Sequence, residues 1–239
     1  MRRAHALMAL VLLVGACGDG DDGESGGSTT TEATSTSTTA DDPGGELPGE
    51  VIEIYPYEGA SLAVVGVERD DTLAVRTGPG TDFDVVTELS PLATGVIATG
   101  HNRQVTDAIW AEVEAEGGTG WADVRYLLQL GATDDVTESL VDADGQLPAG
   151  ETMVDVAGAV AERRASTEPP SRTAVIEDPE VGELGSITVD VIGLGDDALG
   201  GERLHILAEP VPEGEAFVVQ SVQRLALCSR GVTDDGLCV

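Results

Sequence analysis

Turn-forming residues interrupt the apolar stretches of this chain every few positions, and this spacing limits its folded part to short strands. Between residues 61 and 128, short apolar segments alternate with Gly, Pro, Ser and Thr. These segments lie at 73–75, 85–89, 96–98, 109–113, 120–122 and 126–128. Many short strands at close spacing predict a small β-barrel or sandwich. Because only 3% of the residues are aromatic, its core must be small and mostly aliphatic.

The chain begins with the features of an export signal. Residues 1–5, MRRAH, form a short basic segment, and residues 6–14 read ALMALVLLV. This run is shorter than the roughly 20 residues that span a bilayer, and it matches the apolar region of a signal peptide. Residues 14–17, VGAC, resemble the lipobox of bacterial lipoproteins. The resemblance implies a signal peptide at 1–16 and lipidation of Cys17, which anchors the protein to the outer face of the cell membrane. An ordinary secretory signal with an incidental cysteine is the alternative.

Residues 17–50 predict a disordered tether between this anchor and the folded part. After Cys17 the segment consists almost entirely of Gly, Ser, Thr, Asp, Glu, Ala and Pro. Little apolar burial is available to offset the entropy cost of ordering such a segment. Its acidic run at 18–24, GDGDDGE, lacks the spacing of an EF-hand calcium loop. We interpret this run as a solvated spacer.

Three stretches between residues 51 and 130 carry a family resemblance. They read LAVRTGPGTDFDVVTEL (73–89), WAEV (110–113) and TGWADVRYL (119–127). In order and spacing these stretches resemble the bacterial SH3 (SH3b) domain family. The chain departs from the family pattern at Ala74, where Asn is usual, and in a polar loop expected at 101–107. The resemblance implies a compact SH3-like β-barrel, and its common role implies docking onto peptidoglycan or wall peptides.

Trp110 is the first candidate for ligand binding in this module. Ala111 and Val113 share one face of a strand, so Trp110 points outward if Val113 points into the core. An outward tryptophan in a chain this poor in aromatics is a candidate binding residue. Packing of Trp110 beneath the 101–107 loop is the alternative.

Three further residues complete the set of candidate binding residues. Trp121 follows a glycine on the closing strand and is expected in or partly in the core. Arg76, in the first turn, could pair with a ligand carboxylate or brace the turn. Asn102 lies in the expected polar loop.

Residues 131–150 are acidic and predict a linker to a second small domain at 151–239. Thr152 and Asp155 have the spacing of a capping box, and apolar residues at helical spacing follow as far as Val160. Period-two alternation at 187–191 and further strands at 202–208 and 217–228 predict an antiparallel sheet. One helix on such a sheet makes a small α+β domain. The chain as a whole is therefore expected to be mainly β.

Cys228 and Cys238 are the only cysteines besides Cys17. In an exported protein a disulfide between them is the default expectation. The alternative is catalytic, because residues 227–231, LCSRG, faintly resemble the nucleophile region of the cysteine peptidases often fused to SH3b modules. That family has its histidine downstream, whereas no histidine follows Cys228 here. Cleavage of the signal would leave only His101 and His205, so few histidines remain for a catalytic triad or a metal site.

The charge balance narrows the classes of partner. The net charge is −32, from 44 acidic and 12 basic residues, and every basic residue is arginine. Such a chain repels phosphate backbones, which excludes nucleic acid as a partner. No nucleotide-binding or nucleophile-elbow motif is present. We therefore expect a protein that is not an enzyme and holds no cofactor or metal.

Three functional classes stay open. The first is a membrane-anchored module that docks on peptidoglycan or wall peptides. The second is an envelope scaffold or accessory subunit that recruits a protein partner through its C-terminal domain. The third is a cell-wall hydrolase with an unrecognised site, which has the least support.

Overall fold

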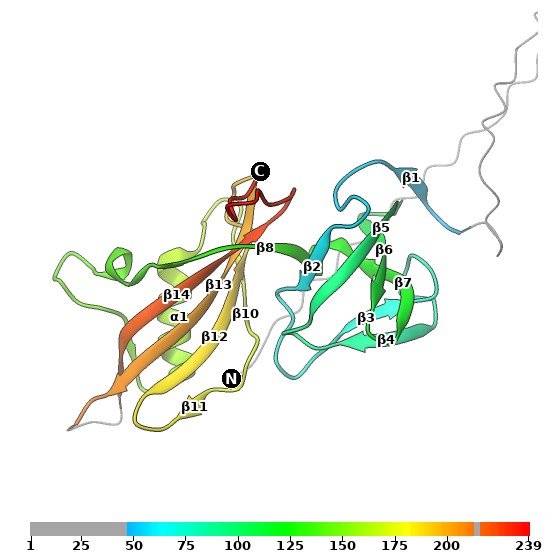
Figure 1. The fold of residues 1–239 in the computed structure, drawn as a ribbon. Helices are drawn as coiled ribbons and strands as arrows, with labels where there is room; N and C mark the ends of the chain where they lie inside the picture. The colour runs from blue at the N-terminus through cyan, green and yellow to red at the C-terminus, as the bar shows by residue number, and fades with distance from the viewer. Residues whose placement is uncertain (1–46, 213–215) are drawn as a thin grey trace, which may run out of the picture. The chain divides into compact units, whose positions relative to one another are not determined.

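Antiparallel strands dominate the computed structural model, which describes residues 47–212 and 216–239 (Figure 1). In these residues fourteen strands pair into one sheet that does not close on itself, in the order β10-β12-β13-β14-β8-β2-β5-β6-β7-β3-β4. The short strands β1, β9 and β11 pair with β5, β14 and β12. The expected mainly β fold is confirmed. Cys17, the signal and the tether up to residue 46 lie outside the described residues.

The strands have the following bounds: β1 Glu50–Ile52, β2 Ser61–Val64, β3 Leu73–Arg76, β4 Val85–Leu89, β5 Thr94–Val105, β6 Ala108–Ala115, β7 Gly118–Asp123, β8 Leu127–Asp135, β9 Ala149–Gly150, β10 Arg172–Val175, β11 Glu180–Val181, β12 Gly185–Ile192, β13 Leu199–Pro210 and β14 Phe217–Cys228. Helix α1 spans Met153–Arg164, and single 3-10 turns lie at Val124–Tyr126 and Thr137–Leu140.

Two separate groups of buried apolar side chains hold the sheet together. The first comes mainly from β2, β3, β5, β6 and β7 and includes Leu62, Val75 and Val113. The second comes from α1, β12, β13 and β14 and includes Val189 and Ile206. Buried and less buried residues alternate along β3, whereas β12 has five consecutive buried residues because helix α1 and strand pairing cover it. We call the residues around the first core the first half and those around the second core the second half.

Strand β8 belongs to both halves, so the prediction of a linker at 131–150 is wrong. Its first residues pair with β2, and residues 129–135 pair with β14. Beyond it, Leu140 is 1% exposed and packs in the second core. The acidic side chains of this segment lie on the outside, where Asp134 binds Arg224 at 2.8 Å. An antiparallel strand can expose polar side chains while its backbone groups pair with neighbouring strands. For that reason the acidic sequence of this segment suggested a linker rather than a strand.

Helix α1 begins at the expected capping box and packs on the second core. The backbone N–H of Asp155 donates to the Thr152 hydroxyl at 3.1 Å, and the N–H of Thr152 donates to the Asp155 carboxylate at 2.9 Å. Both bonds satisfy N–H groups that the helix start leaves without partners. The buried face of the helix presents Met153, Val156 and Val160 to the sheet.

The prediction of a polar loop at 101–107 is also wrong. Strand β5 continues to Val105, and β6 begins at Ala108 after a tight turn in which Thr106 has a φ of 53°. Polar residues such as Asn102 and Gln104 therefore pair across the hairpin with β6. The polar side chains suggested a loop, but the backbone of each is satisfied by the ladder.

A buried ion pair connects the two halves. Asp190 on β12 and Arg203 on β13 are register partners, with side chains 0% and 9% exposed. Arg203 donates to both Asp190 oxygens, at 2.8 and 2.9 Å, and also to the carbonyl oxygens of Val64 and Pro91 in the first half, at 2.8 and 3.3 Å. One of these Asp190 oxygens, Oδ2, also accepts the N–H of Gly66 at 2.8 Å. Because both charges are paired and hydrogen-bonded, they tolerate burial at this junction.

Candidate functional site

Both tryptophans lie on the outer face of the first half, and both are buried. Trp110 pairs with Asp123 across β6 and β7, while Trp121 pairs with Glu112 two residues further on, so both indoles share one face. Their exposed fractions are 6% and 5%. Trp121 is buried as expected. Of the two alternatives left open for Trp110, exposure and packing, the structure shows packing, although the 101–107 segment is strand and tight turn rather than a loop. Parity places Trp110 on the outer face correctly; its cross-strand neighbours, about 5 Å away, leave the ring little solvent contact.

Trp110 nevertheless borders a cavity. This cavity of about 610 Å³ is lined from the first half by Trp110, Arg76, Arg125 and Tyr126 and from the second half by Arg172 on β10. Small and polar residues, including Gly66, Glu68, Asp71 and Asp123, complete its wall. A concave site with aromatic and charged side chains from several strands is the usual form of a ligand site. The cavity brings together two of the four expected binding residues, Trp110 and Arg76.

The charged groups of the cavity differ in how they are paired. The Nε of Arg125 donates to Asp123 at 3.0 Å, and this hydrogen bond raises the pKa of the guanidinium above its ordinary value. The guanidinium of Arg172 lies 4.7 Å from the centre of the Tyr126 ring, a cation–π distance. Its Nη2 also donates weakly to the carbonyl oxygen of Arg125 at 3.4 Å. Arg125 is thus paired with a carboxylate of the protein, whereas Arg172 contacts a ring and a carbonyl oxygen.

Arg76 braces its turn, as one of its two expected roles required. Its Nη1 donates to the carbonyl oxygen of Phe83 at 2.8 Å, across the turn between β3 and β4. A guanidinium carries five N–H donors, so this single bond leaves most of them directed elsewhere. Bracing and ligand binding are therefore compatible for Arg76.

Asn102 serves a different segment of the chain. It is 2% exposed, and its Nδ2 donates to the carbonyl oxygens of Ile54 and Pro56 at 2.8 and 3.0 Å. Its Oδ1 is the one buried side-chain polar atom without a partner among the described residues. Asn102 does not line the cavity. Its contacts fix the chain that leads into β2.

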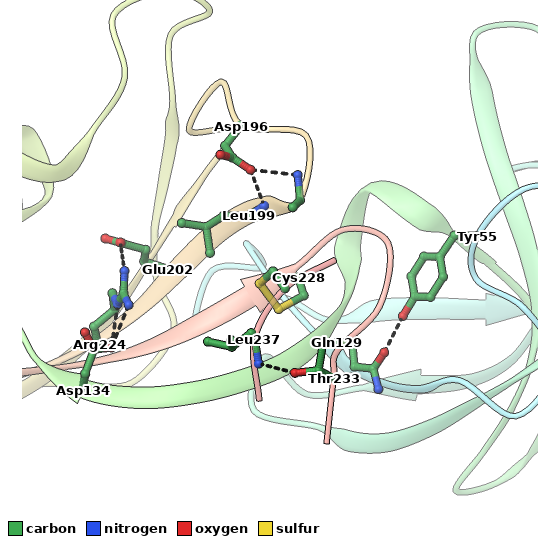
Figure 2. Close-up of a disulfide and its surroundings, with 12 residues drawn as sticks. Tyr55, Gln129, Asp134, Asp196, Leu199, Glu202, Arg224, Cys228, Thr233 and Leu237 are labelled. Atoms are coloured by element: carbon green, nitrogen blue, oxygen red, sulfur yellow. Dashed lines mark hydrogen bonds and ion pairs between the residues drawn. A yellow bond between two sulfur atoms is a disulfide. The ribbon is translucent and has the colours of Figure 1, made fainter. Parts of the chain in front are cut away.

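The expected disulfide joins Cys228 to Cys238 and holds the C-terminal tail (Figure 2). Cys228 is the last residue of β14 and is fully buried. Within the closed loop, Gly236 accepts a hydrogen bond from the N–H of Ala132 on β8 at 2.7 Å. A sulfur in a disulfide is not a thiolate. The cysteine-peptidase alternative therefore has no nucleophile at Cys228.

Each of the two histidines in the described residues, His101 and His205, lies in a cluster with a threonine and a glutamate, which the sequence does not reveal. The Thr188 hydroxyl contacts His205 Nδ1 at 3.1 Å and donates to Glu177 at 2.6 Å. In a hydrolytic triad the histidine must bridge the nucleophile and the acid. Here the threonine is the bridge, and His205 makes no contact with Glu177 in either bond, so this cluster lacks the triad geometry.

The second cluster fails the same requirement. Glu112 accepts from the Thr99 hydroxyl at 2.8 Å and lies 2.7 Å from His101 Nδ1. The Thr99 hydroxyl also lies 3.4 Å from the same Nδ1, so His101 uses one ring nitrogen for both partners, whereas a triad histidine uses one nitrogen for the nucleophile and the other for the acid. Neither histidine lines the cavity. In the described ranges no group of three or more His, Cys, Asp and Glu is arranged to hold a metal ion. No helix within residues 47–212 and 216–239 has the length and apolarity to cross a membrane.

Comparisons with known proteins add no relative. No protein-family model, no curated protein and no solved structure matches the chain.

Arg125, Tyr126 and Arg172 are site residues that sequence reasoning does not identify. Arg125 and Tyr126 lie in the stretch TGWADVRYL, which indicates only the family resemblance. Arg172 opens β10, nearly one hundred positions after Arg76 in the sequence. Strand order, rather than local spacing, brings the two to one cavity. The one available signal is that arginine is the chain's only basic residue type apart from histidine.

Proposed function

We propose that this chain is a lipid-anchored protein of the bacterial cell envelope that binds peptidoglycan or wall peptides without catalysis. In this proposal Cys17 carries the anchor, residues up to about 50 form the tether, and the first half is an SH3-like barrel followed by a small α+β domain. The observation that carries the binding role is the cavity, which Trp110 and Arg76 line together.

The strand pairing supports an SH3-like first half. Strand β2 pairs with β5 on one side and β8 on the other, while β7 pairs with both β6 and β3. These short strands surround one aliphatic core. The motif stretches fall on β3–β4, β6 and β7–β8, so the residues that resemble the SH3b family form the walls of this core and of the cavity.

A sedimentation experiment tests the binding role. The chain from residue 18 onward keeps every described residue and is mixed with purified sacculi at low and high salt, then spun down. We expect the protein to pellet with the sacculi. High salt screens the attraction between Arg76 and a wall carboxylate, and a fall in pelleting at high salt would show that this attraction outweighs the repulsion between an acidic protein and an acidic wall.

Two tryptophan variants separate the cavity from general stability. Trp110→Leu removes the aromatic wall of the cavity, and we expect binding to fall about tenfold. Trp121→Leu is the matched control, because Trp121 is equally buried on the same face and does not line the cavity. Equal losses in both variants contradict a role for the cavity. A protein that stays in the supernatant turns the search to a protein partner for residues 150–239.

A further inference from the structure

The arginines of this protein divide into those that have a carboxylate partner and those that do not. Seven of the ten arginines in the described ranges lie within 4.0 Å of a carboxylate of those ranges, namely Arg69, Arg125, Arg163, Arg164, Arg203, Arg224 and Arg230. Arg76, Arg103 and Arg172 lack such a partner there. Carboxylates are abundant in this chain, with 44 acidic residues, so an arginine without one is notable. Two of these three line the same cavity.

Contacts across the junction fix the position of Arg172. Its guanidinium packs on Gly66, where an added Cβ would stand 2.7 Å from Nη2. Gly66 is itself held by its hydrogen bond to buried Asp190. Strand β10 is tied to the first half by the N–H of Arg69, which donates to the carbonyl oxygen of Val175 at 2.8 Å. The cation is therefore placed in the cavity by backbone contacts from both halves.

The three carboxylates in the cavity wall are already engaged. Asp123 binds Arg125 through both oxygens. Glu68 accepts the N–H of Val175 at 3.1 Å, and Asp71 accepts the N–H of Thr72 at 2.8 Å. The donors left for a ligand are thus on Arg76 and Arg172, beside two aromatic rings.

From this arrangement we infer that the cavity is a composite site for a carboxylate group of a wall peptide, bound by Arg76 from the first half and Arg172 from the second. Guanidinium groups bind carboxylates with short, charge-assisted hydrogen bonds, and Trp110 and Tyr126 add apolar atoms to the cavity wall for the rest of a peptide. This inference rests on the proposed function and deepens it. It also gives the second half a direct part in binding, in place of a separate recruiting role.

The test compares native sacculi with sacculi whose carboxyl groups have been converted to methylamides. The wild-type chain from residue 18 onward should bind the amidated sacculi about tenfold less well, since each charge-assisted bond lost costs about that factor. Charge repulsion alone has the opposite sign: a strongly acidic protein, which keeps all 44 Asp and Glu residues, should bind better once the wall carboxylates are neutral. The direction of the change therefore identifies the mechanism.

The variant Arg172→Gln connects the effect to the cavity. We expect it to bind native sacculi about tenfold less well than wild type and to lose the preference for native over amidated sacculi. Arg230→Gln is the control; it removes the same charge from a half-exposed arginine outside the cavity and should bind as wild type does. Thermal melts verify that both variants are folded.

Each result has a defined reading. Equal wild-type binding to native and amidated sacculi overturns the carboxylate site and leaves the proposed wall binding standing. Wild-type behaviour of Arg172→Gln overturns the part assigned to the second half. Absence of binding to both kinds of sacculi rejects the proposed function, and this inference with it.

Discussion

The arginine at the junction and the arginines of the cavity differ in how many of their hydrogen-bond donors have partners within the protein. At the junction, Arg203 is buried and every contact it makes is with the protein itself, namely Asp190, Val64 and Pro91. In the cavity, Arg76 and Arg172 each make one hydrogen bond to a carbonyl oxygen and none to a carboxylate of the described ranges. A buried charge needs full compensation to remain folded. A charge beside a cavity can keep its donors for a ligand, so pairing distinguishes a structural cation from a binding one.

The largest expected effect comes from breaking the junction pair. Arg203→Met leaves the Asp190 carboxylate buried without its partner, and we expect the free energy of unfolding to fall by about 3–5 kcal/mol. Urea denaturation at neutral pH measures this loss. The double variant Asp190→Leu with Arg203→Met removes both charges and should recover part of the stability. A loss below about 1 kcal/mol in the single variant contradicts full burial of the pair.

The next effect tests the glycine between the two environments. Gly66 has a φ of +62°, and a Cβ there would approach Arg172 and Ile192, so Gly66→Ala should destabilise by about 1–3 kcal/mol and weaken binding to sacculi. Gly59→Ala is the matched control, because Gly59 has a φ of +81° but open space around the added methyl group. It should show only the backbone cost, about 1 kcal/mol. Equal losses would mean that Arg172 simply moves aside.

A smaller effect concerns a polar link in the first half. The Tyr55 hydroxyl donates to Gln129 on β8 at 3.0 Å, as Figure 2 shows, and burial raises its pKa to about 12 from an ordinary value of 10. The folded state therefore favours the neutral phenol. Its contribution to stability is complete below pH 10 and is lost as the pH rises towards 12.

The variant Tyr55→Phe checks this alkaline dependence. At neutral pH it should lose about 1 kcal/mol, the worth of one hydrogen bond. Between pH 10 and 12 its stability should fall less steeply than that of wild type. Parallel curves from chemical denaturation at several pH values would show that Tyr55 is not the titrating group.

The smallest expected effect gives the sharpest contrast with Arg203. Arg172→Gln should change the free energy of unfolding by less than about 1 kcal/mol, because a cation–π contact and one long hydrogen bond are all it loses. The same denaturation experiment measures it. A loss as large as that of Arg203→Met would make Arg172 a structural cation.

Local patterns in the sequence predicted the local structure. The spacing of Thr152 and Asp155 predicted the start of α1, and the alternation at 187–191 predicted β12. The predicted disulfide between Cys228 and Cys238, which lie ten positions apart, is present. These features depend on residues that are near one another along the chain, which a sequence displays directly.

Features that depend on long-range pairing were not predictable. The acidic residues after Leu130 conceal a strand, since the sequence does not show that β14 supplies its hydrogen bonds. Parity gave the face of Trp110 but not what covers it. The cavity requires β3 and β10 to meet, and no spacing in the chain encodes that meeting. The sequence therefore predicted Trp110 and Arg76 as residues of the candidate site but did not predict the others.

The shared strand β8 has a consequence for anyone who would transplant the first half into another protein. A cut at residue 130, where the sequence places the module boundary, passes through the middle of one strand. The excised piece would keep the pairing of β8 with β2 and lose the rest, along with Arg172. Recombination at this point would deliver a set of short strands with only part of the cavity wall, because Arg172 and its neighbours on β10 would stay behind.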